Sequence, residues 1–190
     1  MRDKQRKTVS EKKRRLIGAD ITIKNNTNGK VNLKSERNGG SIYSIEQYES
    51  LDIPFEDLQN IMRKHKSMFE DFAVIIDDVY APDDDELTVE DVEEVLGLTR
   101  IRKGLDDTPD DYMFDDLLLE YSFEEFEDEV NRFKLPVVKR LAERAIYLYL
   151  QREFSNNHKM NLLEKRLGVK NIFEDVERSQ KPIRSDFDLM

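Results

Sequence analysis

Carboxylates are the side chains of this sequence with the clearest potential for chemistry. Asp77 and Asp78 directly follow the apolar run 74–76, and the ends of strands are positions at which catalytic carboxylates occur. Four further aspartates, which could supply ligands for the same hard metal ion, are Asp106, Asp107, Asp110 and Asp111. A metal-dependent nuclease or phosphotransferase would need these groups to converge on one metal ion.

Other features of the sequence argue against an enzyme. Gly39 and Gly40 belong to an expected hairpin, and no glycine-rich phosphate-binding loop lies between a strand and a helix. Cysteine is absent, which excludes disulfides, thiolate nucleophiles and cysteine zinc sites. His65 and His158 lie in polar stretches near expected helix ends, so we expect both at the surface. We predict no catalytic residue, no cofactor and no metal site.

The acidic run Asp83–Glu86 invites comparison with a calcium-binding EF-hand loop. A loop that begins at Asp83 has Glu94 at its twelfth position, where a bidentate ligand is required. However, Leu87 occupies the fifth position, which needs an oxygen ligand, and Thr88 occupies the sixth, where glycine makes the turn. The run is therefore interpreted as part of a solvated linker.

Charge is segregated along the chain. Residues 1–37 carry 12 basic and 4 acidic side chains, whereas residues 77–129 carry 3 basic and 22 acidic ones. Residues 130–190 are again basic, with 13 basic and 8 acidic side chains, and the net charge is −10. Such a chain can attract an anionic partner at one block and a cationic partner at another. No apolar run is long enough for a transmembrane helix and no signal peptide is recognised, so we expect no membrane partner.

The first part of the chain has the pattern of short strands. Apolar residues alternate with polar ones at 21–23 and at 31–35, and Asn38–Gly40 carries an Asn-Gly pair typical of a type I′ hairpin turn. Pro54 is expected at the first position of a helix, with Asp52 as its cap. The run 72–76 then predicts a buried strand. We expect a small β-rich domain over residues 18–79.

The second part has the pattern of helices. Residues 80–108 are expected to form an acidic linker with one short helix, which begins at a capping box from Thr88 to Asp91 and ends at Gly97. Residues 109–169 are expected to form a helical domain, with a further capping box at Ser122 and Glu125. The predicted fold class is therefore α+β, with a β-rich N-terminal unit followed by an acidic helical unit.

Both ends of the chain are expected to be extended arms, because neither has enough apolar residues to build a core. The arm 1–17 is basic and flexible, and it is expected to bind either an acidic protein surface or nucleic acid, unless it is only a solubilising tail. Its candidate partner-binding residues are Arg2, Lys4, Arg6, Lys7, Lys12, Lys13, Arg14 and Arg15. The arm 170–190 has four candidate apolar anchors, which are Ile172, Phe173, Phe187 and Leu189.

The N-terminal unit, about 60 of the 190 residues, resembles structural proteins of tailed bacteriophages through three motifs. They are Ile21–Val31 (ITIKNNTNGKV), Asn38–Gly40 and Ile53–Leu58 (IPFEDL). The resemblance implies a virion protein at a head, neck or tail junction, such as a head–tail connector, assembled in the host cytoplasm. It implies other virion subunits as partners and a homo- or hetero-oligomeric assembly.

Two functional hypotheses follow, and the sequence leaves both open. The first is a non-enzymatic structural protein that binds neighbouring subunits through its charged arms and helical surface. The second is an acidic DNA mimic or host-takeover regulator that occupies a basic cleft, such as that of RNA polymerase, because rows of carboxylates imitate phosphates.

Overall fold

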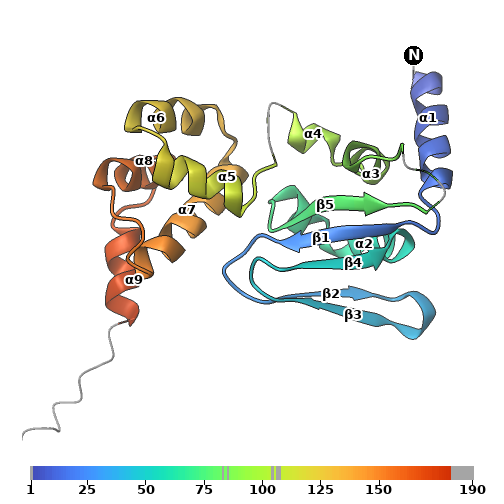
Figure 1. The fold of residues 1–190 in the computed structure, drawn as a ribbon, viewed down its shortest axis with the longest axis horizontal. Helices are drawn as coiled ribbons and strands as arrows, with labels where there is room; N and C mark the ends of the chain where they lie inside the picture. The colour runs from blue at the N-terminus through green and yellow to red at the C-terminus, as the bar shows by residue number, and fades with distance from the viewer. Residues whose placement is uncertain (1, 83, 85, 104, 106–107, 181–190) are drawn as a thin grey trace, which may run out of the picture. The chain divides into compact units, whose positions relative to one another are not determined.

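The computed structural model describes residues 2–82, 84, 86–103, 105 and 108–180, with the side chains of these residues from residue 8 onward except at Asn38 and Gln180. The chain forms two compact units, Met1–Met113 and Phe114–Met190. Among the described residues, the first unit contains five strands together with helices, and the second contains helices and no strand (Figure 1). The predicted α+β class is therefore confirmed.

A three-stranded antiparallel sheet and a separate hairpin form the centre of the first unit. The strands are β1 (Asp20–Asn25), β2 (Val31–Ser35), β3 (Ser41–Ile45), β4 (Ser50–Pro54) and β5 (Val74–Tyr80). The order in the sheet is β4-β1-β5, so the first strand lies between the last two, while β2 pairs only with β3 (Figure 1). Ile21 and Ile23 of β1 are buried in the core, as the alternation of apolar and polar residues predicts.

The hairpin between β2 and β3 has a longer connection than the predicted two-residue turn. Ser35 pairs with Ser41, so residues 36–40 form the loop, which contains the 3₁₀ turn η1 (Arg37–Gly39). Gly39 and Gly40 have φ of 92° and 94°, a region in which a side chain is strained. The glycines therefore lie at the expected bend, but the type I′ assignment is wrong.

Four helices complete the first unit: α1 (Arg2–Arg15), α2 (Phe55–Glu70), α3 (Val89–Leu96) and α4 (Thr99–Arg102). Helix α2 packs against the strands through an apolar face that includes Phe55, Leu58 and Ile61, all fully buried. Its N-cap is Pro54 rather than Asp52. Asp52 instead accepts a hydrogen bond from the hydroxyl of Thr22, its partner on β1, at 2.6 Å.

The segment 80–108 is part of the first unit and differs from the expected linker. It contains two helices, α3 and α4, and α3 packs on β5. The capping box at Thr88 and Asp91 is present, and Gly97 ends the helix in the left-handed conformation, as predicted. Val92 and Leu98 are buried in the core that also contains β1. The region 80–108 is therefore attached to the first unit by its own apolar side chains.

The second unit is built from consecutive helices. Helix α5 (Asp111–Asp115) leads into it, followed by the π-helical turn η2 (Asp116–Glu120), α6 (Phe123–Arg132), α7 (Leu135–Leu150), α8 (Asn157–Leu167) and α9 (Ile172–Gln180). Phe114, Phe126, Leu141 and Leu163 are buried in it. The predicted capping box at Ser122 and Glu125 is present. Asn156 caps α8, because its side chain accepts hydrogen bonds from the backbone of His158 and Lys159.

Within the described residues, no helix combines the length and apolar character needed to span a membrane.

Candidate binding surfaces

The basic N-terminal segment folds as a helix and is partly neutralised. Lys12 forms ion pairs with Asp91, at 2.6 Å, and with Glu94 of α3. Arg15 binds Asp84 through two hydrogen bonds of 2.5 and 2.7 Å, which hold the pKa of that carboxyl below its usual range. The expectation of a flexible arm is therefore wrong for its second half, because neighbouring carboxylates supply partners that the composition of residues 1–17 alone does not reveal.

The other residues of the expected basic arm have different environments. Lys13 and Arg14 are exposed to solvent, so both remain available to a partner. Four residues have side chains outside the described part of the structure: Arg2, Lys4, Arg6 and Lys7.

Two of the four candidate C-terminal anchors, Ile172 and Phe173, belong to helix α9. Phe173, on α9, is 1 % exposed, and its ring contacts those of Tyr149 and Phe154 with centroids 5.7 and 6.5 Å apart. Ile172 is half-buried at the start of the same helix. The prediction that Phe173 anchors a partner is wrong, because the aromatic side chain completes the core of its own unit. Phe187 and Leu189 lie outside the described residues.

Three of the six candidate metal ligands lie around a buried lysine. Lys24, on β1, forms ion pairs with Asp111 and, at 3.8 Å, with Asp110, and it also interacts electrostatically with Asp77. Its ammonium lies 4.6 Å from the centroid of the Tyr112 ring. Burial lowers the pKa of Lys24, but these carboxylates outweigh that effect and raise it. The aspartates therefore stabilise a cation that the protein itself supplies.

The other candidate ligands do not join this arrangement. Asp78 is exposed and accepts a hydrogen bond from the backbone of Val79. Asp106 and Asp107 fall outside the described residues. Within the described part of the chain, no three His, Cys, Asp or Glu side chains are arranged to hold a metal ion.

A cleft of about 380 Å³ lies between β5, α3 and the segment that follows α4. Glu93 and Arg102 form a pair in its wall, with Nε of Arg102 2.5 Å from the carboxylate. Burial raises the pKa of Glu93 above its usual range, although Arg102 opposes this effect. Asp77 and Glu90 also line the cleft, so it favours cationic groups. This pair could not be predicted from the sequence, because Glu93 lies among other acidic residues.

The two histidines have no arrangement typical of catalysis. His65 is half-buried where α2 departs from helical geometry, with φ of −114° and ψ of 21°. His158 is exposed, as expected, and its ring lies 5.6 Å from that of Phe123.

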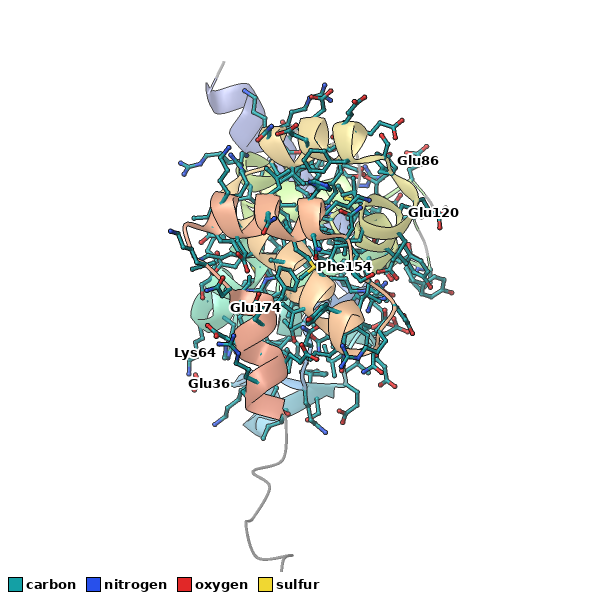
Figure 2. The ribbon with its side chains drawn as sticks, turned by 90° about the vertical axis from the view of Figure 1, so that its left-hand side faces the viewer. Glu36, Lys64, Glu86, Glu120, Phe154 and Glu174 are labelled. Carbon is teal, nitrogen blue, oxygen red and sulfur yellow. The ribbon has the colours of Figure 1, made fainter. Side chains whose placement is uncertain are left out.

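An acidic surface extends over residues 116–128, which we call the acidic segment. It contains no Lys or Arg, and two apolar side chains are exposed within it, Leu119 at 44 % and Tyr121 at 42 %. Its exposed carboxylates are Asp116, Glu120, Glu124, Glu125 and Asp128. Figure 2 shows the side chain of Glu120 projecting away from the ribbon.

The acidic segment is held by a lysine that the sequence analysis did not single out. Lys159 of α8 is 2 % exposed, and its ammonium donates hydrogen bonds to the carbonyl oxygens of Leu117, Leu118 and Tyr121 at 2.9, 2.9 and 2.6 Å. It thereby satisfies carbonyls that the end of η2 leaves open. The available signal was position, because Lys159 shares a helical face with the apolar residues Leu162 and Leu163.

No family model, curated protein or solved structure matches this chain.

Proposed function

We propose that this protein is a non-enzymatic binding protein that joins neighbouring protein subunits during assembly of a larger particle. The observation that supports the proposal is the acidic segment. Its five exposed carboxylates form no ion pair within 4 Å to another described residue, and they accompany the exposed side chains of Leu119 and Tyr121. Asp115, just before the segment, shows the contrast, because Arg144 binds it with two hydrogen bonds of 2.6 Å.

This combination of side chains suits a basic protein partner. Tyrosine is enriched at protein interfaces, since its ring offers a large apolar area together with a polar hydroxyl. The surrounding carboxylates increase the encounter rate with a positively charged surface and repel nucleic acid. The proposal therefore assigns affinity to Leu119 and Tyr121, and encounter and orientation to the carboxylates.

The sequence resemblance favours a tailed-phage particle as the setting, with other virion subunits as partners. The same acidic segment is also compatible with the second hypothesis, in which the protein is an acidic regulator that occupies a basic cleft such as that of RNA polymerase. Carboxylates along helix α6 can compete with DNA phosphates for such a cleft. The two hypotheses differ in the identity of the partner and agree on the surface that binds it.

Affinity capture with matched variants tests the proposal. The test variant carries Glu120→Gln, Glu124→Gln and Asp128→Asn, which neutralise three exposed carboxylates of the acidic segment. The control carries the same change in charge at three scattered exposed carboxylates: Glu11→Gln, Glu49→Gln and Glu153→Gln. Wild-type protein and both variants are immobilised at equal density and exposed to extract from cells that make the protein.

The proposal expects wild-type and control proteins to retain the same partner at low salt, and the test variant to lose it. The retained partner should also be released at high salt, because exposed charges are screened. Virion proteins among the retained partners support the assembly hypothesis, and polymerase subunits support the regulator. Equal retention by the test variant would overturn the proposal, since the partner would then bind elsewhere.

A further inference from the structure

The first unit contains a positively charged groove, which we call the basic groove. It has a volume of about 260 Å³ and lies where α1, α2 and α3 meet. Its lining comprises Lys13, Gln59, Met62, Arg63, Lys66, Val95 and Leu96. No carboxylate contributes to this lining, although the chain as a whole carries a net charge of −10.

The cations of the basic groove are available for binding. Lys13 and Arg63 are exposed, and neither forms an ion pair within 4 Å to another residue of the described ranges. Lys66 pairs with Glu70 one helical turn away at 2.6 Å, with both side chains close to half exposed. Such surface pairs contribute little to stability, so Lys66 can exchange this partner at small cost.

Between the cations, the groove is apolar. Met62 is buried, and Val95 and Leu96 are half-buried on α3. A ligand must therefore combine negative charge with apolar side chains. A nucleic acid backbone meets the first requirement but not the second. An acidic protein surface with exposed apolar side chains meets both requirements.

The acidic segment has this composition. Glu124 and Asp128 lie one turn apart on α6 and provide negative charge, and Leu119 and Tyr121 provide exposed apolar area. We propose that the basic groove of one molecule binds the acidic segment of a second copy of this chain. This inference rests on the proposed function of the acidic segment and names its partner.

Such a contact is heterologous, because two different surfaces of the chain are complementary. A pair joined by one such contact keeps one unused groove and one unused acidic segment, which either meet each other in a closed dimer or extend the assembly into rings or open chains. Charge complementarity makes the association sensitive to salt, since most of the groups involved lie at the surface.

Sedimentation velocity over a range of protein concentrations tests this inference with two variants. The groove variant carries Arg63→Gln and Lys66→Gln, and the segment variant carries Glu124→Gln and Asp128→Asn. A control variant carries Lys165→Gln and Lys170→Gln, which neutralise two exposed lysines of the second unit. All substituted side chains are exposed, so unchanged circular dichroism and unfolding midpoints confirm that each variant folds.

The inference expects wild-type and control proteins to associate with rising concentration at low salt and to dissociate at high salt. The groove variant and the segment variant, each by itself, should associate at least about tenfold more weakly than wild-type protein, which is a loss of about 1.4 kcal/mol in binding free energy. An equal mixture of the two should form dimers and stop there, because each dimer uses the one intact groove and the one intact segment.

Two results would overturn the inference. One is a wild-type protein that stays monomeric at every concentration at low salt. The other is association that the groove variant leaves unchanged. The capture experiment separates these results from a failure of the proposed function. If the groove variant and wild-type protein retain the same cellular partner while neither self-associates, only the present inference is wrong.

Discussion

The ammonium of Lys159 lies 2.6 Å from the carbonyl oxygen of Tyr121, so a buried cation holds the segment that presents the most acidic surface of the second unit. The same ammonium lies 5.2 Å from the centroid of the Phe126 ring on α6. One side chain of α8 thus fixes both the end of η2 and the start of α6. The exposed carboxylates therefore project from a segment that Lys159 anchors to α8.

Lys159→Met should destabilise the protein by about 2–4 kcal/mol, because the carbonyls of Leu117, Leu118 and Tyr121 lose a buried donor. Urea unfolding followed by circular dichroism measures the change. Lys165→Met, at an exposed position of the same helix, is the control and should cost less than about 0.5 kcal/mol. Equal effects of the two substitutions would show that Lys159 is not a structural cap.

Asn25→Ala should cost about 2–4 kcal/mol. The Asn25 side chain is fully buried, and its amide donates to the carbonyls of Gly29, Ile45 and Glu46 at 2.7, 3.1 and 3.0 Å. It thereby ties β1 to the open end of the hairpin, where β2 begins and β3 ends. Thermal unfolding measures the loss, with Asn32→Ala on the exposed side of β2 as the control. An unaltered midpoint for Asn25→Ala would contradict this account of how the hairpin is held.

Asp57 should make stability depend on pH in the acid range. Burial raises the pKa of its carboxyl, but hydrogen bonds from Ser35 and Tyr43, both 2.6 Å, outweigh burial and lower it. The ionised group therefore stabilises the fold above the unfolded pKa of about 3.9, and this contribution is lost as pH falls through the lower folded value. Asp57→Asn should lower the free energy of unfolding near neutral pH.

Urea unfolding of wild-type protein and Asp57→Asn at neutral and at strongly acidic pH checks the sign. The difference between the two proteins should shrink as pH falls below about 4. A difference that stays constant over the whole range would mean that the Asp57 carboxyl has no lowered pKa in the folded protein.

Millimolar Mg²⁺ or Ca²⁺ should leave the unfolding temperature unchanged, because Lys24 already occupies the position between Asp110 and Asp111. Differential scanning calorimetry with and without metal, at matched ionic strength, measures this. A rise in unfolding temperature of several degrees would show that a cation site exists and would favour the hypothesis of a metal-dependent enzyme.

Local patterns in the sequence were sufficient to predict several elements. The capping boxes at Thr88 and Ser122 and the C-cap at Gly97 depend on neighbouring residues, so spacing alone reveals them. The hairpin was predictable for the same reason, although its turn type was not. The turn type was missed because a five-residue connection with a 3₁₀ turn reverses the chain direction just as a two-residue turn does.

The candidate sites were harder to predict, because their partners lie far apart in the sequence. Lys12 and Arg15 meet carboxylates more than sixty positions away, which converts the second half of an expected arm into a docked helix. Long-range pairs also join α2 to the end of β2, where Figure 2 shows Lys64 beside Glu36. The central position of β1 between β4 and β5 is likewise a tertiary property. The concentration of acidic residues at 77–129 predicted the acidic surface, but the distribution of charge along the sequence did not predict a basic groove in a chain that is acidic overall.

Site-specific photocrosslinking tests the central claim, that the acidic segment is a binding surface, most directly. A photoreactive phenylalanine replaces Tyr121 in the full-length protein, and a second protein carries it at Tyr80, which is 64 % exposed in the first unit. The account predicts that irradiation in cell extract at low salt yields a discrete protein adduct from position 121 and not from position 80. This adduct should disappear when Glu120, Glu124 and Asp128 are neutralised. Adducts of equal yield at both positions, or an adduct that survives neutralisation, would contradict the claim.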